Sequence, residues 1–244
     1  MFVVDSHSHL GISSISGVNV SESELIEKMN THQVDVSFVM PHAFQDLKSK
    51  EVHDRIYALS QKYPQRIYGI ASVSPRIEEE DYCLEIKRCV EELGFIGIKF
   101  DPIVFALPIN HRTTKIVYKM AMKYKVPVII HTGGGAFANP LKAIDIAQEF
   151  PQLSIVLAHA GFGTYFEEAI HAAKLCPNIY LDHSWSTHQQ LKSMVKILGS
   201  EKVMFGSDHL SNIPIEYSKI DLMLEENRDR ANVLGETAKK VFKI

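Results

Sequence analysis

Eight short apolar segments constrain the fold of this chain more than any other feature of its sequence. Most are rich in β-branched residues and lack regular polar alternation, which is typical of parallel strands covered on both faces. The segments are 2–5, 36–40, 66–73, 95–100, 126–131, 153–159, 178–182 and 202–208. Their spacing is close to the roughly 30 residues of a βα unit. The sequence therefore predicts an α/β fold, a single-domain (β/α)8 TIM barrel over residues 1–244.

Segments with helical periodicity separate the predicted strands. One apolar face contains Tyr82, Ile86, Cys89, Val90 and Leu93, and another contains Ile116, Met120, Ala121 and Tyr124. Ser21, followed three residues later by Glu24, is a capping-box pattern that predicts a helix start. Prolines at 64 and 151 predict helix ends just before them. Helices and strands thus alternate along the chain.

Composition narrows the class of protein. The 244 residues are 45% hydrophobic, enough for a full core, and the formal net charge is −3. The chain has no run of five or more like charges, so neither nucleic acid nor an anionic membrane is indicated as a partner. We therefore expect a small-molecule substrate. Three cysteines without a Cys-x-x-Cys pair predict no disulfide framework. With no basic leader and no apolar stretch that could span a bilayer, we expect a soluble, cytoplasmic protein.

Polar residues of metal-binding and catalytic types collect where the predicted strands end. In a (β/α)8 barrel the active site lies at this carboxyl end of the strands. The residues are His7, His9, Lys99, Asp101, His131, His159, Asp182, His183, Asp208 and His209, and they include six of the 12 histidines. Two long loops, 10–20 and 101–111, follow strands at the same end. We expect these loops to shape a substrate pocket.

The first strand carries an Asp-x-His-x-His pattern at 5–9. Alternate side chains of a strand point to one face, so the bases of His7 and His9 would lie roughly 6.6 Å apart. Neutral imidazoles at this spacing can bind one cation, because zinc–nitrogen bonds are about 2.0–2.1 Å long. Asp5 could orient a histidine, hold the strand in place, or do neither, and we do not assign it as a ligand.

The other histidines have different expected positions. His32, His53, His171 and His188 fall in helical segments, where an exposed surface position is the default expectation. His42 and His111 fall in loops that would face the mouth of the barrel. These two are candidate substrate contacts.

Seven segments together resemble the metal-dependent amidohydrolase superfamily, in particular the branch of aminocarboxymuconate semialdehyde decarboxylase and related small hydrolases. They are Asp-x-His-x-His at 5–9, GIASVSP at 69–75, GIKF at 97–100, VPVIIHTG at 126–133, FPQLSIVLAHAGFG at 150–163, NIYLD at 178–182 and FGSD at 205–208. The resemblance spans essentially the whole chain. It departs from the common pattern at SDHLSNIP, 207–214, and at VLGETAKKVF, 233–242.

The resemblance implies a catalytic metal centre. In this interpretation His7, His9 and His131 bind a divalent cation, Zn²⁺ by expectation and one per chain. Asp208 is both a ligand and a proton-transfer group, and His159 contacts the metal-bound water or the substrate. Two structural alternatives stay open at this point: His159 could bond a backbone carbonyl, and Asp208 could cap the segment that follows it.

Lys99 has two interpretations. In some superfamily members a lysine that ends the fourth strand is carbamylated and bridges two metals, and His159 would then be a ligand of the second metal. We favour a contact with a substrate carboxylate, or a position near Asp101, and His209 is a second candidate substrate contact. The glycines of TGGG, 132–135, lack the Gly-Lys-Ser/Thr ending of a phosphate loop, so nucleotide binding is not indicated.

The leading hypothesis is a hydrolase that uses a zinc-activated water on a small amide, ester or lactone. The alternative is a metal-dependent non-oxidative decarboxylase of a small carboxylic acid. Arginines usually bind substrate carboxylates, and those of this chain fall mostly away from the predicted mouth. Lys99, or an arginine from a partner subunit in a homo-oligomer, could take that role.

Two further hypotheses have less support. A TatD-like nuclease shares the His-x-His opening, but it would carry a glutamate near GIKF and a basic surface patch, and this chain has neither. A barrel without catalytic activity would keep its metal only for stability or bind a metabolite. This idea fits poorly, because no expected ligand is replaced by an apolar residue.

Overall fold

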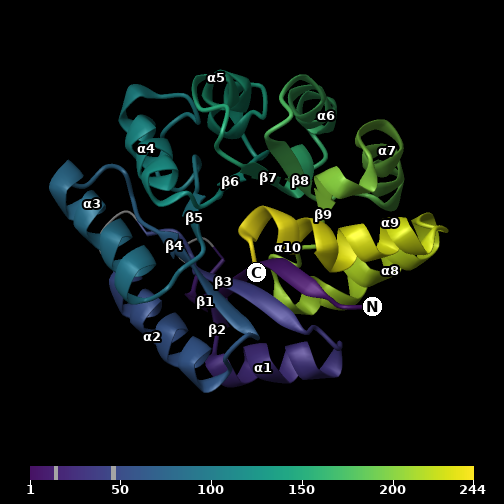
Figure 1. Cartoon of the computed structure of the whole chain (residues 1–244), viewed down its shortest axis with the longest axis horizontal. Coiled ribbons are helices and arrows are strands. Elements are labelled where there is room, and N and C mark those ends of the chain that lie inside the picture. Colours follow the sequence, from purple (N-terminus) through teal and green to yellow (C-terminus); the bar gives the residue numbers. More distant parts are fainter. Residues whose placement is uncertain (14–15, 45–47) are drawn as a thin grey trace.

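The computed structural model describes residues 1–13, 16–44 and 48–244. Within them the chain forms a curled nine-stranded sheet with helices around it (Figure 1). The strands are β1 (Val4–Ile12), β2 (Asn19–Val20), β3 (Val36–Pro41), β4 (Ile67–Ser72), β5 (Gly97–Phe100), β6 (Val128–His131), β7 (Ile155–Ala158), β8 (Ile179–Asp182) and β9 (Val203–Met204). From β1 and β3 onward, neighbours pair in parallel in chain order. The expected alternation of parallel strands with helices is confirmed.

The helices begin and end near the signals in the sequence. They are α1 (Glu22–Thr31), α2 (Ser49–Lys62), α3 (Glu79–Lys87), α4 (Lys115–Tyr124), α5 (Lys142–Glu149), α6 (Phe166–Leu175), α7 (His188–Leu198), α8 (Ile213–Met223), α9 (Asn227–Ala231) and α10 (Thr237–Phe242). The Ser21 side chain accepts the Glu24 N–H and caps α1. Helices α2 and α5 end just before their prolines, as predicted. No helix of the described residues has the length and apolar character needed to cross a membrane.

Two apolar layers hold the fold together. Between the sheet and the helices, Tyr82, Ile86 and Cys89 of the predicted α3 face are fully buried. Inside the curl, a second cluster joins Val4 and Val36, near the strand starts, to α10. The ring of Phe242 lies 4.6 Å from that of Phe38, and Figure 1 shows α10 and the C-terminus near the centre of the ring of elements. Helix α10 thus covers the amino end of the strands, and the active site of such a fold lies at their carboxyl end.

The two ends of the sheet meet through a non-strand segment. Strand β9 is shorter than the predicted 202–208, and no ladder between β9 and β1 appears among the described residues. Instead, residues 205–208 run along β1: the Ser6 N–H donates to the Phe205 carbonyl at 3.0 Å. The Asp208 N–H likewise donates to the His7 carbonyl, at 2.6 Å. Asp208 itself has a positive φ of 60°, outside the extended region that a strand requires.

Strand β1 extends beyond the apolar run 2–5 and contains His7 and His9, as the alternating pattern at 5–9 predicted. Its register with β3 is irregular between Asp5 and Ser8, and β2 adds an antiparallel strand at its far end. The short apolar run that starts β1 does not reveal this length, because the continuation is polar and buried. Ser6 extends the strand because its buried hydroxyl donates to the Phe205 carbonyl, and His7 extends it because its buried ring pairs with Asp182.

His53 corrects one expectation. His171 and His188 are exposed and His32 is half-buried, but His53 is fully buried, so an exposed helix face is the wrong prediction for it. Its Nε2 accepts the Ser72 N–H at 3.0 Å, so its proton sits on Nδ1, 2.8 Å from Glu85 Oε1. The Cys89 Sγ lies 3.4 Å from the same nitrogen. These partners belong to β4, α3 and the turn after it, which a local pattern does not show.

Replacing His53 should destabilise the fold. The His53→Ala variant leaves the Ser72 N–H without its acceptor and opens a cavity, so we expect the free energy of unfolding to fall by roughly 2 to 4 kcal/mol. Urea unfolding followed by circular dichroism measures this. The control is His171→Ala on the exposed face of α6, expected within about 0.5 kcal/mol of the parent protein. Equal stability of the two variants would contradict the structural role of His53.

Candidate metal centre

A pocket of about 370 Å³ opens at the carboxyl ends of the strands. Its lining includes His9, Ser13, Ser16, His42, Ala43, Lys99, Asp101, Val104, His131, His159, Phe162, Trp185, Asp208 and His209. Seven of the ten predicted strand-end residues therefore line one pocket. Both long loops contribute to it as expected, through Ser13 and Ser16 of 10–20 and Val104 of 101–111. Residues 14 and 15 of the first loop lie outside the described residues.

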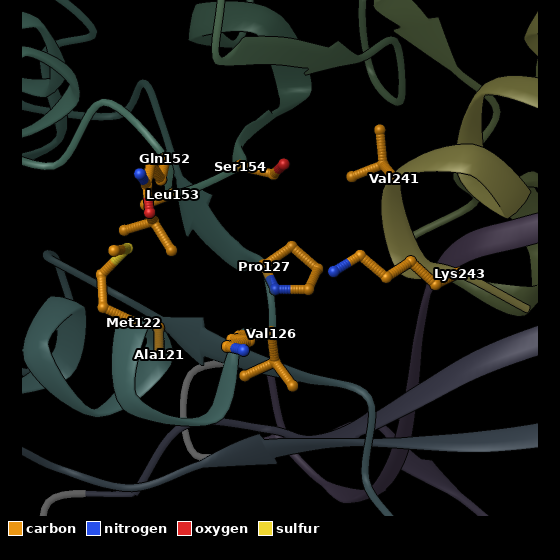
Figure 2. A pocket seen from close by; sticks show the side chains of 10 residues that line it. Ala121, Met122, Val126, Pro127, Gln152, Leu153, Ser154, Val241 and Lys243 are labelled. Carbon is orange, nitrogen blue, oxygen red and sulfur yellow. The ribbon is translucent and has the colours of Figure 1, made fainter.

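A second pocket, of about 250 Å³, lies at the opposite end of the sheet. Figure 2 shows its lining, with Pro127 and Ser154 from the segments that lead into β6 and β7, and Lys243 from the end of the chain. Its lining contains no histidine, carboxylate or cysteine. The first pocket is therefore the candidate active site.

His7, His9 and Asp208 converge on one point. The Nε2 atoms of the two histidines are 3.2 Å apart, and Asp208 Oδ1 lies 3.3 Å from the first and 3.2 Å from the second. Two separate parts of the chain meet here, because the histidines lie on β1 and Asp208 follows β9. The hydrogen bond from Asp208 N to the His7 carbonyl fixes their approach.

The outer nitrogens of the two histidines have acceptors, which assigns their tautomers. His7 Nδ1 lies 2.7 Å from Asp182 Oδ2, and His9 Nδ1 lies 3.3 Å from the Pro41 carbonyl. Each Nδ1 therefore carries the proton, and each Nε2 presents a lone pair. Two lone pairs and a carboxylate oxygen then face one another at 3.2–3.3 Å with no hydrogen between them. Lys99 Nζ, 2.8 Å from His7 Nε2, offsets part of this repulsion, and a bound cation would satisfy all three atoms, so the donor set fits a divalent metal.

His131 and His159 stand beside this point. The His159 ring centroid is 5.0 Å from that of His7, and the His131 ring centroid is 4.8 Å from that of His159. Among the described residues, potential ligand atoms lie within 4.8 Å of one another in the sets His7–His9–Asp208 and His7–His159–Asp182. His131 belongs to neither set. The structure thus brings four of the five predicted ligands into close groups and places the fifth next to them.

Burial controls the charges of the site. Burial, reinforced by the nearby Lys99, holds the pKa of His7 well below its usual range. Burial also lowers the pKa values of His159 and His131. For Asp208 burial raises the pKa, but His159, His7 and His9 together outweigh it and hold the pKa well below its ordinary value. Neutral imidazoles and an ionised carboxylate are the states that metal ligands require.

Lys99 points into the same cluster. It is 3% exposed, and its Nζ lies 2.8 Å from His7 Nε2. Burial lowers the pKa of Lys99, while Asp208 and Asp101 act in the opposite direction. A buried amino group therefore stands within reach of anything bound beside His7.

Backbone strain accompanies the site. His159, Trp185 and Asp208 have φ values of 65°, 61° and 60°, in the left-handed region that costs non-glycine residues about 1–3 kcal/mol each. Hydrogen bonds from neighbouring segments hold them there.

Asp5 accepts from the Ser207 N–H at 2.9 Å and from its hydroxyl at 2.6 Å, and burial raises the pKa of Asp5 to about 7. Asp5 therefore positions the strand rather than facing the pocket.

The substrate-contact candidates have different positions. His209 lines the pocket, and His42 lines it with its ring stacked on His9 at 4.4 Å between centroids. His111 lies elsewhere: its Nδ1 accepts the Thr113 N–H and caps a helical turn. His183 also turns away, and its Nδ1 lies 2.8 Å from the buried carboxylate of Glu216.

Sequence reasoning missed two residues that contact the site, Ser184 and Trp185, although it had identified Asp182 just before them. Asp182 accepts from His7, Ser184 bonds both Asp182 and His159, and the Trp185 indole N–H donates to Asp208 Oδ2 at 2.7 Å. Trp185 is the only tryptophan of the chain, and its ring lies 6.0 Å from that of Phe162. All three residues lie in or directly after NIYLD, so the strand-end rule that identified Asp182 could have been extended by three positions.

A comparison with known families shows which family the chain belongs to. A profile described as amidohydrolase matches residues 32–244. The chain belongs to the amidohydrolase family. It is therefore an enzyme of the metal-dependent amidohydrolase superfamily, as the motifs predicted. The match begins after His7 and His9, so these two histidines are assigned to the site by their geometry alone.

Individual relatives of this amidohydrolase are distant. A 2-keto-4-carboxy-3-hexenedioate hydratase from Sphingobium sp. (strain NBRC 103272 / SYK-6) is 21% identical over 216 residues, which cover 74% of this chain and 62% of the hydratase. The match thus spans less than two thirds of that relative.

Solved structures share the fold over the whole chain. A 5-carboxyvanillate decarboxylase from Novosphingobium aromaticivorans, complexed with manganese, has a TM-score of 0.81 at 16% identity, covering 100% of this chain and 96% of that one. A 2,6-dihydroxybenzoate decarboxylase from Rhizobium has a TM-score of 0.81 at 16% identity, with coverage of 100% and 99%. At such identity these likenesses establish the fold.

The geometry predicts one divalent ion per chain. Titrating Zn²⁺ or Mn²⁺ into metal-free protein should change the fluorescence of Trp185, which contacts Asp208, and saturate at one equivalent. His9→Asn should abolish stoichiometric binding, and Asp182→Asn should weaken it by about 10–100-fold, because it removes the acceptor that orients His7. The control is His171→Asn, expected to bind normally. Two equivalents by elemental analysis would contradict this prediction and favour a carbamylated Lys99.

Proposed function

We propose that this amidohydrolase catalyses the metal-dependent, non-oxidative decarboxylation of a small carboxylic acid. The observation that carries the proposal is the position of Lys99, a buried amino group 2.8 Å from His7 Nε2 inside an enclosed cluster of histidines. Two positive charges, a cation and an ammonium, would then face one substrate anion. The two decarboxylases that share the fold support this choice over the hydrolysis of an amide, ester or lactone.

The arginines do not compete with Lys99 for this role. Among the described residues that line the pocket there is no arginine. Arg76, which follows β4, donates instead to the carbonyls of Phe105 and Ala106 and so holds the 101–111 loop in shape. Arg55 pairs with Glu22 at the surface, and Arg88 pairs with the buried Glu85. Among the described residues that line the pocket, Lys99 is therefore the lysine or arginine side chain that can contact a substrate carboxylate.

The proposed metal ligands are His7, His9 and Asp208, with His131 completing the set, and His159 stands beside them facing the bound substrate. A divalent cation bound there would fix the substrate's oxygen atoms and withdraw electron density from them. Zinc is the metal expected from the sequence, and manganese is present in the 5-carboxyvanillate decarboxylase structure. Nitrogen and carboxylate donors accept either ion, so the proposal is for a divalent cation of this type.

The reaction needs one bond broken and one proton delivered. The bond between the substrate carbon and its carboxylate breaks, carbon dioxide leaves, and the electron pair stays on carbon and takes a proton. Lys99 would hold the substrate anion, and His159 would take a proton from the substrate or solvent and return it to that carbon. Asp208 is the second candidate for this proton transfer. Phe162 and Trp185 at the pocket mouth would restrict water.

The closed (β/α)8 barrel is part of the same proposal. Hydrogen bonds from the Ser6 main chain and side chain to the Phe205 carbonyl support closure, because they connect the first strand to the segment after the last. A closed ring would hold Asp208 against His7 during the reaction.

Hydration of an unsaturated carboxylic acid is a second candidate. The sequence match to the Sphingobium hydratase favours it, and a substrate of that kind would present the same carboxylate to Lys99. The two reactions differ in their products. Hydration adds water across a double bond and releases no carbon dioxide.

Labelled substrates separate these reactions. We expect metal-loaded protein to release ¹³CO₂ from at least one acid in a panel of hydroxybenzoic acids labelled at the carboxyl carbon, and to place one solvent deuterium on the carbon that loses it. Asp208→Asn should lower the rate by about 10² to 10⁴-fold. His111→Asn keeps a capping side chain outside the pocket and serves as the control. Incorporation of ¹⁸O from water into the product of a hydroxybenzoate, an unsaturated acid or a lactone, without ¹³CO₂ from any acid, would contradict decarboxylation.

A further inference from the structure

A buried serine connects two histidines of the site. Ser184 Oγ lies 2.8 Å from His159 Nδ1 and 3.0 Å from Asp182 Oδ2, and the same carboxylate oxygen lies 2.7 Å from His7 Nδ1. We propose that Ser184 is a positioning residue that fixes which nitrogen of His159 faces the substrate. The inference rests on the proposed function only in giving His159 a role in proton transfer.

The direction of each hydrogen bond follows from counting protons. A carboxylate offers only acceptor atoms, so Asp182 accepts the proton of His7 Nδ1 and that of the Ser184 hydroxyl. A hydroxyl has one proton. Once it is donated to Asp182, the oxygen can only accept from His159. His159 therefore carries its proton on Nδ1 and presents the lone pair of Nε2.

The reverse arrangement is unfavourable. If the hydroxyl donated to His159 instead, lone pairs of Ser184 Oγ and Asp182 Oδ2 would face each other at 3.0 Å in a site without water access. Both residues are buried, at 0% and 1% exposure. The network thus selects one tautomer of His159.

The surrounding backbone keeps Ser184 in place. Its N–H donates to Asp182 Oδ1 at 2.8 Å, and the next N–H, of Trp185, donates to the buried Glu216 at 2.9 Å. Gly206 packs against the other side of Asp182, where a Cβ atom would lie only 2.6 Å from Oδ1. The carboxylate and the hydroxyl therefore have little freedom to rearrange.

The Asp182 carboxylate therefore sets the tautomers of two histidine rings. One carboxylate assigns the tautomer of His7 directly and that of His159 through Ser184. Removing the hydroxyl should release His159 alone, whereas His7 keeps its bond to Asp182. Ser184 should therefore influence proton transfer without influencing metal binding.

The primary test reads the tautomer directly. In zinc-loaded protein with ¹⁵N-labelled histidine, we expect the His159 ring to show a protonated Nδ1 and an unprotonated Nε2. In Ser184→Ala this pattern should be lost or mixed, and Ser184→Thr, which keeps the hydroxyl, should restore it. The control is Ser186→Ala, because Ser186 is also buried but donates to the His183 carbonyl. A His159 spectrum unchanged in Ser184→Ala would overturn the proposal.

Kinetics give a second readout on any substrate that the enzyme converts. We expect Ser184→Ala to lower kcat by about 10–100-fold, with KM within a factor of about two and one zinc per chain retained. Loss of zinc together with kcat would show a merely structural role and would also overturn the proposal. The spectra need no substrate. A failed decarboxylation assay would therefore count against the proposed function alone, and an unchanged His159 spectrum would count against the role of Ser184 alone.

Discussion

The meeting of β1 with the segment after β9 is the constraint on which the site depends. It brings two imidazole lone pairs and the Asp208 carboxylate within 3.3 Å of one another, although the residues are separated by nearly the whole chain. These three acceptor atoms repel one another, and the Lys99 amino group, 2.8 Å from His7 Nε2, offsets only part of that repulsion. Hydrogen bonds from Ser207 to the Asp5 carboxylate, and those between the main chains of β1 and 205–208, supply the restraint. A bound cation would supply the attraction.

The rest of the structure is arranged to keep this restraint rigid. Asp182, Ser184 and Trp185, at the end of β8 and just after it, contact His7, His159 and Asp208. Left-handed backbone at Trp185 and Asp208 shows that the chain accepts local strain to aim these side chains. The apolar layers around the sheet and the plug formed by α10 provide the stability that offsets it.

The sequence predicted the strand order, the helices and the pocket residues, because apolar periodicity and strand-end polarity are local signals. It could not predict the length of β1 or the burial of His53, because both depend on contacts with residues that are distant in the sequence. The contacts of Ser184 were hidden for the same reason. Hydrolysis led the functional hypotheses from sequence, whereas the decarboxylases that share the fold and the position of Lys99 favour the alternative.

The central claim is that one cation occupies the point shared by β1 and the segment after β9. Anomalous diffraction from crystals of the zinc-loaded protein tests it most directly. We expect a single peak about 2.0–2.2 Å from His7 Nε2, His9 Nε2 and Asp208 Oδ1. A peak at another group, such as His53 with Glu85 and Cys89, and none at this point would contradict the account.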